Sequence, residues 1–469
     1  MSNVAEIQDQ FLTRAEDKTF DAKHRATLNF NIGKYHASVQ NGLKQYQDHE
    51  QARAQASFIK SKTINKLDLF LLEWEANFVH NGGKVIWARN RNEALQEIIR
   101  IFKARQAKLV VKSKSMTSEE LHLNEFLEGN GIESVETDLG EYIVQLRGEA
   151  PYHIVTPAMH LSKKDVGELF QEKLQMPPTD NAEDMVALAR RVMREKYTSA
   201  DVGITGGNFL VADIGGVALT ENEGNARLSV TFPKVHIAIV GIEKIVPSLE
   251  DLDLYWPLLA TSGTGQQVTV YNSVLTGPRK KGETDGPEEM YVVLLDNGRT
   301  DLLADPEKRQ ALNCIRCGAC LNACPVYRSV GGHTYAATYS GPIGSVITPH
   351  YEGMEKFKHL SYASSLCGAC TSVCPVKIDL HNLLLLNRRQ AVEEGLATGD
   401  EKKAMAGFRF TMLNRWTLDL PIAKLKTWAI DKIFGNTWGK RRETPVFAQK
   451  NFKRLWKERQ KQGPQGRSI

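Results

Sequence analysis

The 469-residue sequence lacks a membrane-spanning segment, because it contains no run of about 18 apolar residues. Its start, MSNVAEIQDQFLTRAEDKTF, lacks the basic and then apolar stretch that marks a secretory signal. We therefore expect a cytoplasmic protein, and a peripheral position at a membrane stays open.

The sequence also lacks the short motifs of several enzyme classes. It contains no GxxxxGK phosphate loop, no GxGxxG after a predicted strand, no HExxH and no GxSxG. The sequence thus gives no argument for ATP binding, NAD binding or hydrolysis. Because no flavin fingerprint is present either, we expect hydride chemistry to reside on a partner protein.

Cysteine is scarce and confined to one region. All seven cysteines lie between Cys314 and Cys374. An odd number of thiols in a reducing compartment does not suit a disulfide framework, whereas clustered thiols suit a metal centre. The cysteines therefore predict metal ligation.

The first cysteine run, CIRCGACLNACPVY, has the spacing of a bacterial ferredoxin. Cys314, Cys317 and Cys320 stand three residues apart, which suits one cubane cluster. Cys324 stands beyond reach of that cluster and is typical of a ligand to a neighbouring one. Zinc sites use isolated CxxC pairs, so the run favours iron–sulfur clusters.

The second run, YASSLCGACTSVCPVKI, repeats this pattern with Ser364 in place of the first cysteine. Exchange of the last cysteine between the runs predicts two clusters. The second cluster then has only three thiolates. Its fourth corner is either lost, giving 3Fe–4S, or held by water, serine or a group from a partner. The predicted ligands are Cys314, Cys317, Cys320 and Cys374 for the first cluster, and Cys324, Cys367 and Cys370 for the second.

Patterns along the chain divide it into four segments. Strands separated by helices of 10–15 residues in the second segment indicate a largely parallel sheet with helices on its faces. The segments are an N-terminal helical extension (1–62), an α/β domain (63–300), a mainly helical two-cluster ferredoxin-type domain (301–390) and a basic, Trp-rich C-terminal region (391–469).

Local patterns in the α/β segment predict individual elements. Residues 83–88, 108–115 and 287–298 favour strands, and residues 65–83 and 90–107 favour amphipathic helices. The remaining predictions are a helix over 118–131 capped by Thr117 or Ser118, strands over 133–138 and 141–146, solvated side chains at Lys112 and Lys114, and a helix from Asp305 to Cys314.

The C-terminal region is strongly basic. Residues 401–469 hold 17 Lys or Arg against 5 Asp or Glu, and four of the seven Trp. Its amphipathic helical patterns predict a docking surface for an acidic partner, a membrane surface or nucleic acid. Because helix packing also explains the Trp and no known nucleic-acid module is present, we do not expect a nucleic-acid ligand.

Glycine-rich turns within residues 200–247 indicate a binding site in the α/β segment. Short apolar strands there end in the polar turns TGGN and ENEGN. Ligands of parallel α/β sheets bind outside the carboxyl ends of strands, and the same residues also suit ordinary turns. The candidate binding residues are Thr205, Asn208, Glu223, Asn225, His236 and Glu243.

Several of these stretches together resemble the lactate utilisation protein B family. They are VKSKSMTSEELHLNEFLEGNGIESVETDLGEYIVQL, ADVGITGGNF, ENEGNARL, HIAIVGIEKIVP, CIRCGACLNACPVY and SLCGACTSVCPVKI. The resemblance covers about residues 63–445 and implies a LUD domain of NagB/RpiA/CoA-transferase-like α/β fold, fused to a ferredoxin-type domain. VADIGGVALT departs from the Glu-Thr-Gly common in such domains, so the resemblance assigns no catalytic residue.

The resemblance also implies a function. The chain would be an iron–sulfur subunit of a three-protein system that oxidises L-lactate to pyruvate, with two 4Fe–4S clusters and an open or labile corner on the second. Expected partners are a cysteine-rich subunit, a second LUD protein and an electron acceptor. The alternatives are a LUD enzyme acting on another 2-hydroxy acid or a phosphorylated or acyl substrate, with structural clusters, and an iron–sulfur nucleic-acid-binding protein.

Overall fold

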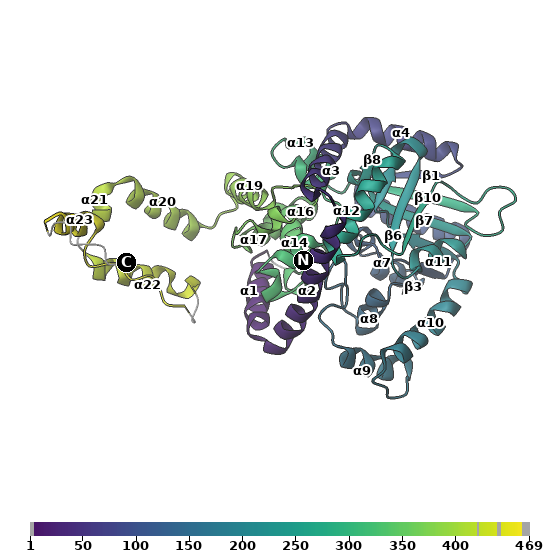
Figure 1. Ribbon diagram of the computed structural model, residues 1–469, viewed down its shortest axis with the longest axis horizontal. Coiled ribbons are helices and arrows are strands. Elements are labelled where there is room, and N and C mark those ends of the chain that lie inside the picture. The colour runs from purple at the N-terminus through teal and green to yellow at the C-terminus, as the bar shows by residue number, and fades with distance from the viewer. Residues whose placement is uncertain (1–3, 420–421, 439–441, 462–469) are drawn as a thin grey trace. The chain divides into compact units, whose positions relative to one another are not determined.

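The computed structural model describes residues 4–419, 422–438 and 442–461 (Figure 1). The chain divides into two compact units, residues 1–394 and residues 395–469. Both sheets and all seven cysteines lie in the first unit. None of the described helices is long and apolar enough to cross a membrane.

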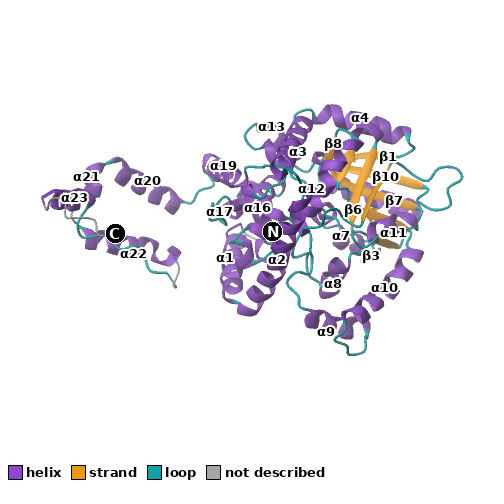
Figure 2. Ribbon diagram, viewed as in Figure 1, coloured by secondary structure: helices purple, strands orange, loops and turns teal. Residues whose placement is uncertain are grey.

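A parallel sheet of six strands forms the centre of the α/β region (Figure 2). Its strand order is β1-β10-β7-β4-β2-β3, and every neighbouring pair is parallel. The parallel sheet confirms the α/β prediction. The strands are β1 (Lys84–Ala88), β2 (Leu109–Lys112), β3 (Glu133–Glu136), β4 (Val202–Thr205), β7 (Val235–Gly241) and β10 (Glu289–Leu295).

A second, four-stranded sheet has the order β8-β5-β6-β9. β5 pairs antiparallel with β6 and parallel with β8, and β6 pairs antiparallel with β9. The turn TGGN joins β4 of the first sheet to β5 of the second. The strands are β5 (Phe209–Val211), β6 (Gly216–Glu221), β8 (Ile245–Val246) and β9 (Tyr271–Leu275).

Alternation along the central strands builds a separate hydrophobic core on each face of the large sheet. In β7, Ala238 and Val240 enter one core and Ile237 and Ile239 enter the other, because successive strand residues point to opposite faces. The flanking helices are α4 (Leu67–His80), α5 (Arg91–Arg105), α6 (Met116–Glu120), α7 (Leu123–Gly129), α8 (Leu139–Arg147), α9 (Lys163–Leu174), α10 (Ala182–Ser199), α11 (Asn225–Thr231) and α12 (Leu252–Thr264).

Residues 141–146 correct the sequence prediction, because they belong to helix α8 and not to a strand. Asp138 caps this helix by accepting the Glu141 amide hydrogen at 3.0 Å, and Gly148 ends it at φ 69°. Six residues with a short apolar run suit either element, and the two caps settle the choice.

Three further predictions of helix position are wrong. Ser115, rather than Thr117 or Ser118, caps α6 by accepting the Ser118 amide hydrogen. The helix expected over 118–131 breaks at His122, where φ is 50°. The segment after Asp305 forms a turn and a short 3-10 helix, η5 (Arg309–Asn313), because Asp305 accepts amide hydrogens within that turn.

Three N-terminal helices cover the cysteine region: α1 (Val4–Phe20), α2 (Ala22–Gly42) and α3 (His49–Ile64). Figure 1 shows α1 and α2 beside α14 and α17. The expected boundary between residues 62 and 63 falls inside α3. Phe11 packs edge-on against Tyr335, which ties the N-terminal extension to the cysteine region.

The cysteine region is mainly helical and shares its core with the smaller sheet and α12. Asn322 donates to the Gly263 carbonyl oxygen at 3.3 Å, which ties this region to α12. Its helices are α13 (Arg299–Ala304), α14 (Ala319–Ala323), α15 (Tyr327–Val330), α16 (Gly341–Tyr351), α17 (Met354–Tyr362), α18 (Ala369–Ser372) and α19 (Leu380–Glu393).

The second unit is helical in its described residues, with Trp416, Trp428 and Trp456 exposed. Residues 420–421, 439–441 and 462–469 of the predicted basic region lie outside the described residues. The helices are α20 (Gly399–Leu413), α21 (Arg415–Asp419), α22 (Ala423–Trp438) and α23 (Phe452–Lys461).

Candidate functional site

The two cysteine runs repeat one backbone conformation. Arg316 and Gly318 flank Cys317 with φ of 61° and 81°, and Leu366 and Gly368 flank Cys367 with φ of 53° and 77°. Each glycine then begins a short helix, α14 in the first run and α18 in the second. Left-handed residues on both sides of a cysteine curl the chain into a loop, as a cluster ligand run requires.

The thiols of the predicted first cluster interact with one another. Cys317 and Cys320 each interact electrostatically with Cys314 and Cys374, although Cys374 lies more than 50 residues further along the chain. Burial raises the pKa of Cys317 and of Cys320, so both thiols prefer the neutral form unless a cation is present. A metal cluster supplies that positive charge.

The remaining three thiols form a second group. Cys324 interacts electrostatically with Cys367 and with Cys370. Cys370 and Cys324 are buried, whereas Cys367 is exposed. The second group therefore reaches the surface of the first unit.

Backbone amides point at the cysteine sulfurs in both groups. The amide of Arg316 donates to Cys314 Sγ at 3.4 Å, and the amide of Ile378 donates to Cys374 Sγ at 3.4 Å. In the second group the amide of Tyr327 donates to Cys324 Sγ at 3.5 Å. Such donors stabilise thiolates that ligate iron. The residues present therefore fit iron–sulfur clusters.

Arg53 of α3 fixes the second run from outside. Its guanidinium donates to the Cys374 carbonyl oxygen at 2.8 and 3.0 Å and to the Ser372 carbonyl oxygen at 2.8 Å. These contacts involve backbone oxygens, so they leave the Cys374 thiol available as a ligand. Two histidines of this region have hydrogen-bond partners in the protein: His333 hydrogen-bonds the Ala150 carbonyl oxygen, and His350 of α16 hydrogen-bonds Asn387.

Three of the six candidates from the α/β segment line one cavity of 330 Å³, namely Asn208, Glu223 and Asn225. The other three lie outside its wall. Thr205 and His236 are fully buried and share a hydrogen bond of 2.9 Å. Burial lowers the pKa of His236 to about 3, so the ring stays neutral.

The wall of this cavity also contains residues of the first cysteine run. Cys317 and Arg316 line it together with Tyr339, Lys244 and Gly263. A Cβ on Gly263 would lie 2.6 Å from the Cys317 carbonyl oxygen, so only glycine lets α12 approach the run this closely. The carboxyl ends of the strands thus face the predicted first cluster across one cavity.

Glu243 belongs to a buried ion-pair network rather than to the cavity. Its Oε2 accepts from Arg299 Nε at 2.6 Å, and its Oε1 lies 3.4 Å from Arg316 Nη2. Burial opposes ionisation of Glu243, but Arg299 and Arg316 outweigh it and lower the pKa to about 2. Arg299 also forms a fork with Glu120, at 2.9 Å for both nitrogens. The network joins the sheet to the cysteine run.

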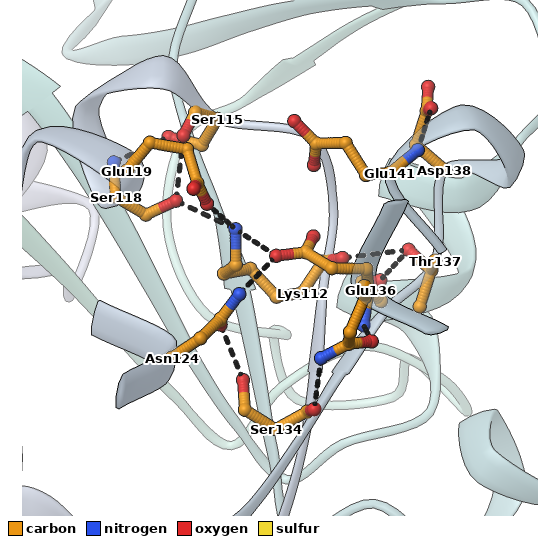
Figure 3. Close-up of polar contacts among 12 residues, drawn as sticks. Lys112, Ser115, Ser118, Glu119, Asn124, Ser134, Glu136, Thr137, Asp138 and Glu141 are labelled. Atoms are coloured by element: carbon orange, nitrogen blue, oxygen red, sulfur yellow. Dashed lines mark hydrogen bonds and ion pairs between the residues drawn. The ribbon is translucent and has the colours of Figure 1, made fainter. Parts of the chain in front are cut away.

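A second buried network surrounds Lys112, at the carboxyl end of β2 (Figure 3). Lys112 is fully buried, which corrects the expectation of a solvated side chain. Its Nζ contacts Glu136 at 2.6 Å and Glu119 at 3.0 Å. Glu141 is 1% exposed, and neither of its carboxylate oxygens has a hydrogen-bond donor among the described residues. All three glutamates border a cleft of 820 Å³.

Sequence reasoning missed the cationic part of the cavity, Lys244 and Arg316. Lys244 ends the 3-10 helix η3 (Ile242–Lys244) that joins β7 to β8, and this position near a strand end was the available signal. Arg316 lies between the predicted ligands Cys314 and Cys317, and the cysteine spacing gives no indication that the arginine side chain lines a cavity. Only long-range packing brings the two side chains to one cavity.

Comparisons with known proteins agree with this arrangement. Residues 71–295 match the LUD domain family, and residues 310–378 match the 4Fe-4S dicluster domain family. The chain is 42% identical to lactate utilization protein B of Shouchella clausii (strain KSM-K16) over 464 residues. This alignment covers 97% of this chain and 98% of the relative.

Two further relatives carry the same name. The protein from Anoxybacillus flavithermus (strain DSM 21510 / WK1) is 48% identical over 361 residues, or 76% of each chain. The protein from Bacillus subtilis (strain 168) is 47% identical over 361 residues, or 76% of this chain and 75% of the relative. A crystal structure of a DUF162 family protein from Deinococcus radiodurans aligns with a TM-score of 0.29 and 13% identity, over 49% of this chain and 98% of that chain. From the curated relatives and the two domain matches, the chain belongs to the lactate utilization protein B family.

Proposed function

We propose that this chain is the iron–sulfur electron-transfer subunit of a complex that oxidises L-lactate to pyruvate and so supports growth on lactate. The names of the curated relatives and the dicluster match support this function. The observation that carries it is the place of Cys317, which lies in the wall of the cavity that the polar turns of the LUD domain line. Because Cys317 is a predicted ligand of the first cluster, electrons from a molecule bound in the cavity have a short path to that cluster.

We assign two 4Fe–4S clusters to the seven thiols. The electrostatic grouping supports Cys314, Cys317, Cys320 and Cys374 as one ligand set and Cys324, Cys367 and Cys370 as the other. Bound clusters supply one-electron transfer between a two-electron donor and a one-electron acceptor. The chain itself holds the thiols, donates amide hydrogens to the sulfurs and keeps water from most ligands of the first set.

Burial gives the electron path a direction. Cys317 and Cys320 of the first set are buried behind the cavity, whereas Cys367 of the second set is exposed. We therefore place electron entry at the first cluster and exit at the second. The exit would serve an external acceptor or a partner subunit.

The remaining assignments extend the resemblance. The partners would be a cysteine-rich subunit and a second LUD protein, and we assign the α/β domain to the NagB/RpiA/CoA-transferase-like folds. A cytoplasmic location suits seven free thiols, because that compartment keeps thiols reduced. The basic C-terminal helices would dock a partner or the membrane surface.

One experiment tests the function directly. The protein is purified anaerobically, combined with the proteins encoded beside it, and mixed with L-lactate while the cluster absorption near ~400 nm is followed. We expect bleaching by L-lactate in the complete mixture. Intact clusters that L-lactate never bleaches would refute the proposal. Glycolate and other 2-hydroxy acids, run in parallel, measure the substrate preference.

A further inference from the structure

Lys244 is a buried ammonium group that faces the cavity without a partner. It is 7% exposed and lines the cavity wall beside Arg316. Among the described residues it has neither a hydrogen bond nor an ion pair. A buried cation without a paired carboxylate is stabilised by an anion that enters the cavity.

Arg316 adds a second set of unused donors at the same wall. Its side chain is 10% exposed, and its Nη1 is buried without a hydrogen-bond partner among the described residues. The guanidinium plane lies over the Tyr339 ring, 4.7 Å from the ring centre, which fixes its orientation. Guanidinium donors match the two oxygens of a carboxylate.

The carboxylates of the cavity, in contrast, already have donors. Glu221 accepts the amide hydrogens of Ala226 at 2.6 Å and Arg227 at 3.0 Å, at the start of α11. Glu223 accepts the Leu139 amide hydrogen at 3.0 Å.

Asp138, the third carboxylate of the wall, accepts the Glu141 amide hydrogen at 3.0 Å and lies 3.9 Å from the Lys114 ammonium. Each carboxylate of the wall thus has a donor within this chain, whereas the Lys244 ammonium and Arg316 Nη1 have no hydrogen-bond partner among the described residues.

The other lining groups suit a small polar molecule. Asn225 is 6% exposed and has no side-chain hydrogen bond among the described residues, so its amide is free for a ligand. Asn208 uses its Oδ1 to accept from the Thr220 amide, which leaves its Nδ2 for the cavity. A volume of 330 Å³ holds a short acid with ordered water.

We propose that this cavity binds the carboxylate of a short 2-hydroxy or 2-oxo acid between Lys244 and Arg316, with the rest of the acid beside Asn208 and Asn225. The inference rests on the proposed function and deepens it, because it places the acid on this chain, next to Cys317, rather than on a partner. The proposal concerns binding of the acid only and includes no chemical step in the cavity.

Equilibrium binding to the anaerobic, cluster-loaded, full-length protein tests the site. The probes for isothermal titration calorimetry are L-lactate, pyruvate, the neutral analogue L-lactamide and inorganic phosphate. We expect both acids to bind and L-lactamide to bind at least about tenfold more weakly, because it lacks the charge-assisted contacts. Equal affinity for L-lactate and L-lactamide, or binding of phosphate alone, would overturn the proposal.

Variants then locate the site. We expect Lys244→Met to weaken L-lactate binding at least about tenfold and the matched surface variant Lys281→Met to leave it unchanged. Lys244→Gln replaces the Met variant if that protein does not retain its iron. A change in cluster reduction potential with unchanged affinity would overturn the proposal, since it would limit Lys244 to balancing the cluster charge.

The two proposals fail in different ways. If L-lactate bleaches the clusters in the complete mixture but Lys244→Met binds L-lactate with unchanged affinity, the binding site in the cavity is refuted and the proposed function stands. Tight, Lys244-dependent binding without bleaching by any neighbouring protein would support the cavity and refute the lactate-oxidising function.

Discussion

Ser364 and Cys314 occupy the same position in the two cysteine runs and make the same hydrogen bond. The Ser364 Oγ accepts the amide hydrogen two residues later at 3.1 Å, and the Cys314 Sγ accepts the corresponding hydrogen at 3.4 Å. The residues that follow share their left-handed backbone conformations. The serine hydroxyl therefore lies where a fourth thiolate of the second cluster would lie.

Replacement of this hydroxyl tests the open corner of the second cluster. We expect Ser364→Cys to supply a fourth thiolate, so that brief air oxidation releases less iron than in the wild type. Ser364→Ala, which keeps the backbone and removes the oxygen, should release more. EPR spectroscopy measures the 3Fe–4S signal that this iron loss produces.

A serine outside the cysteine region provides the control. Ser199→Cys adds an exposed thiol at the end of α10 and should behave as the wild type. Equal iron loss in all four proteins would show that the position 364 side chain does not reach the cluster.

A pair of cysteine variants tests the exchange of ligands between the runs. Cys370 and Cys374 are four residues apart, yet we assign them to different clusters. We expect Cys374→Ala to lose the first cluster and Cys370→Ala to lose the second, each with about half of the iron retained. Iron analysis and EPR of the reduced proteins measure this. Loss of the same EPR signal in both variants would contradict the assignment.

The features that could be predicted from the sequence are those that depend on residues close together in the chain. Strand β7 (Val235–Gly241) and its parallel partners follow from apolar runs, and the cysteine spacing follows from the reach of a short loop. Helix α8 was missed because its apolar run is as short as a strand, and Asp138 decides the outcome through a cap.

The candidate site was predictable only in part. Asn208 lines the cavity because it follows the carboxyl end of β4, where ligands of parallel sheets bind. Glu223 and Asn225 also line it, but they follow β6 of the smaller sheet, which pairs antiparallel with β5 and β9. Glu243 also stands at a strand end, but its partner Arg299 lies 56 residues away and draws it into an ion pair. Pairings over such distances depend on the folded core and leave no local pattern.

The buried Arg299 pairs predict a large stability effect. Arg299→Met leaves the Glu120 carboxylate buried without its ion-pair partner and leaves Glu243 paired with Arg316 alone. We expect a loss of about 3–5 kcal/mol in the free energy of unfolding. Urea unfolding of the cluster-loaded protein measures it. The exposed pair of Arg279 with Glu288 offers the control, because Arg279→Met should cost no more than about 1 kcal/mol. Equal losses in the two variants would contradict a structural role for the network.

Glu141 predicts a pH dependence of stability. Burial, followed by repulsion from Glu136, raises the pKa of Glu141, and Lys112, Glu119 and Asp138 are the other charged groups around it. The folded protein therefore binds a proton that the unfolded chain releases near pH ~4.5, so the free energy of unfolding falls as the pH rises above that value.

Glu141→Gln removes this fall in the free energy of unfolding with rising pH, because glutamine cannot ionise. We expect the variant to be more stable than the wild type at pH ~8, by about 1 kcal/mol or more, and the advantage to shrink toward pH ~5. Urea midpoints at the two pH values measure it, with the exposed Glu128→Gln as the control that should show no such trend. Parallel stability curves for wild type and Glu141→Gln would mean that Lys112 keeps the Glu141 carboxylate ionised in the folded protein.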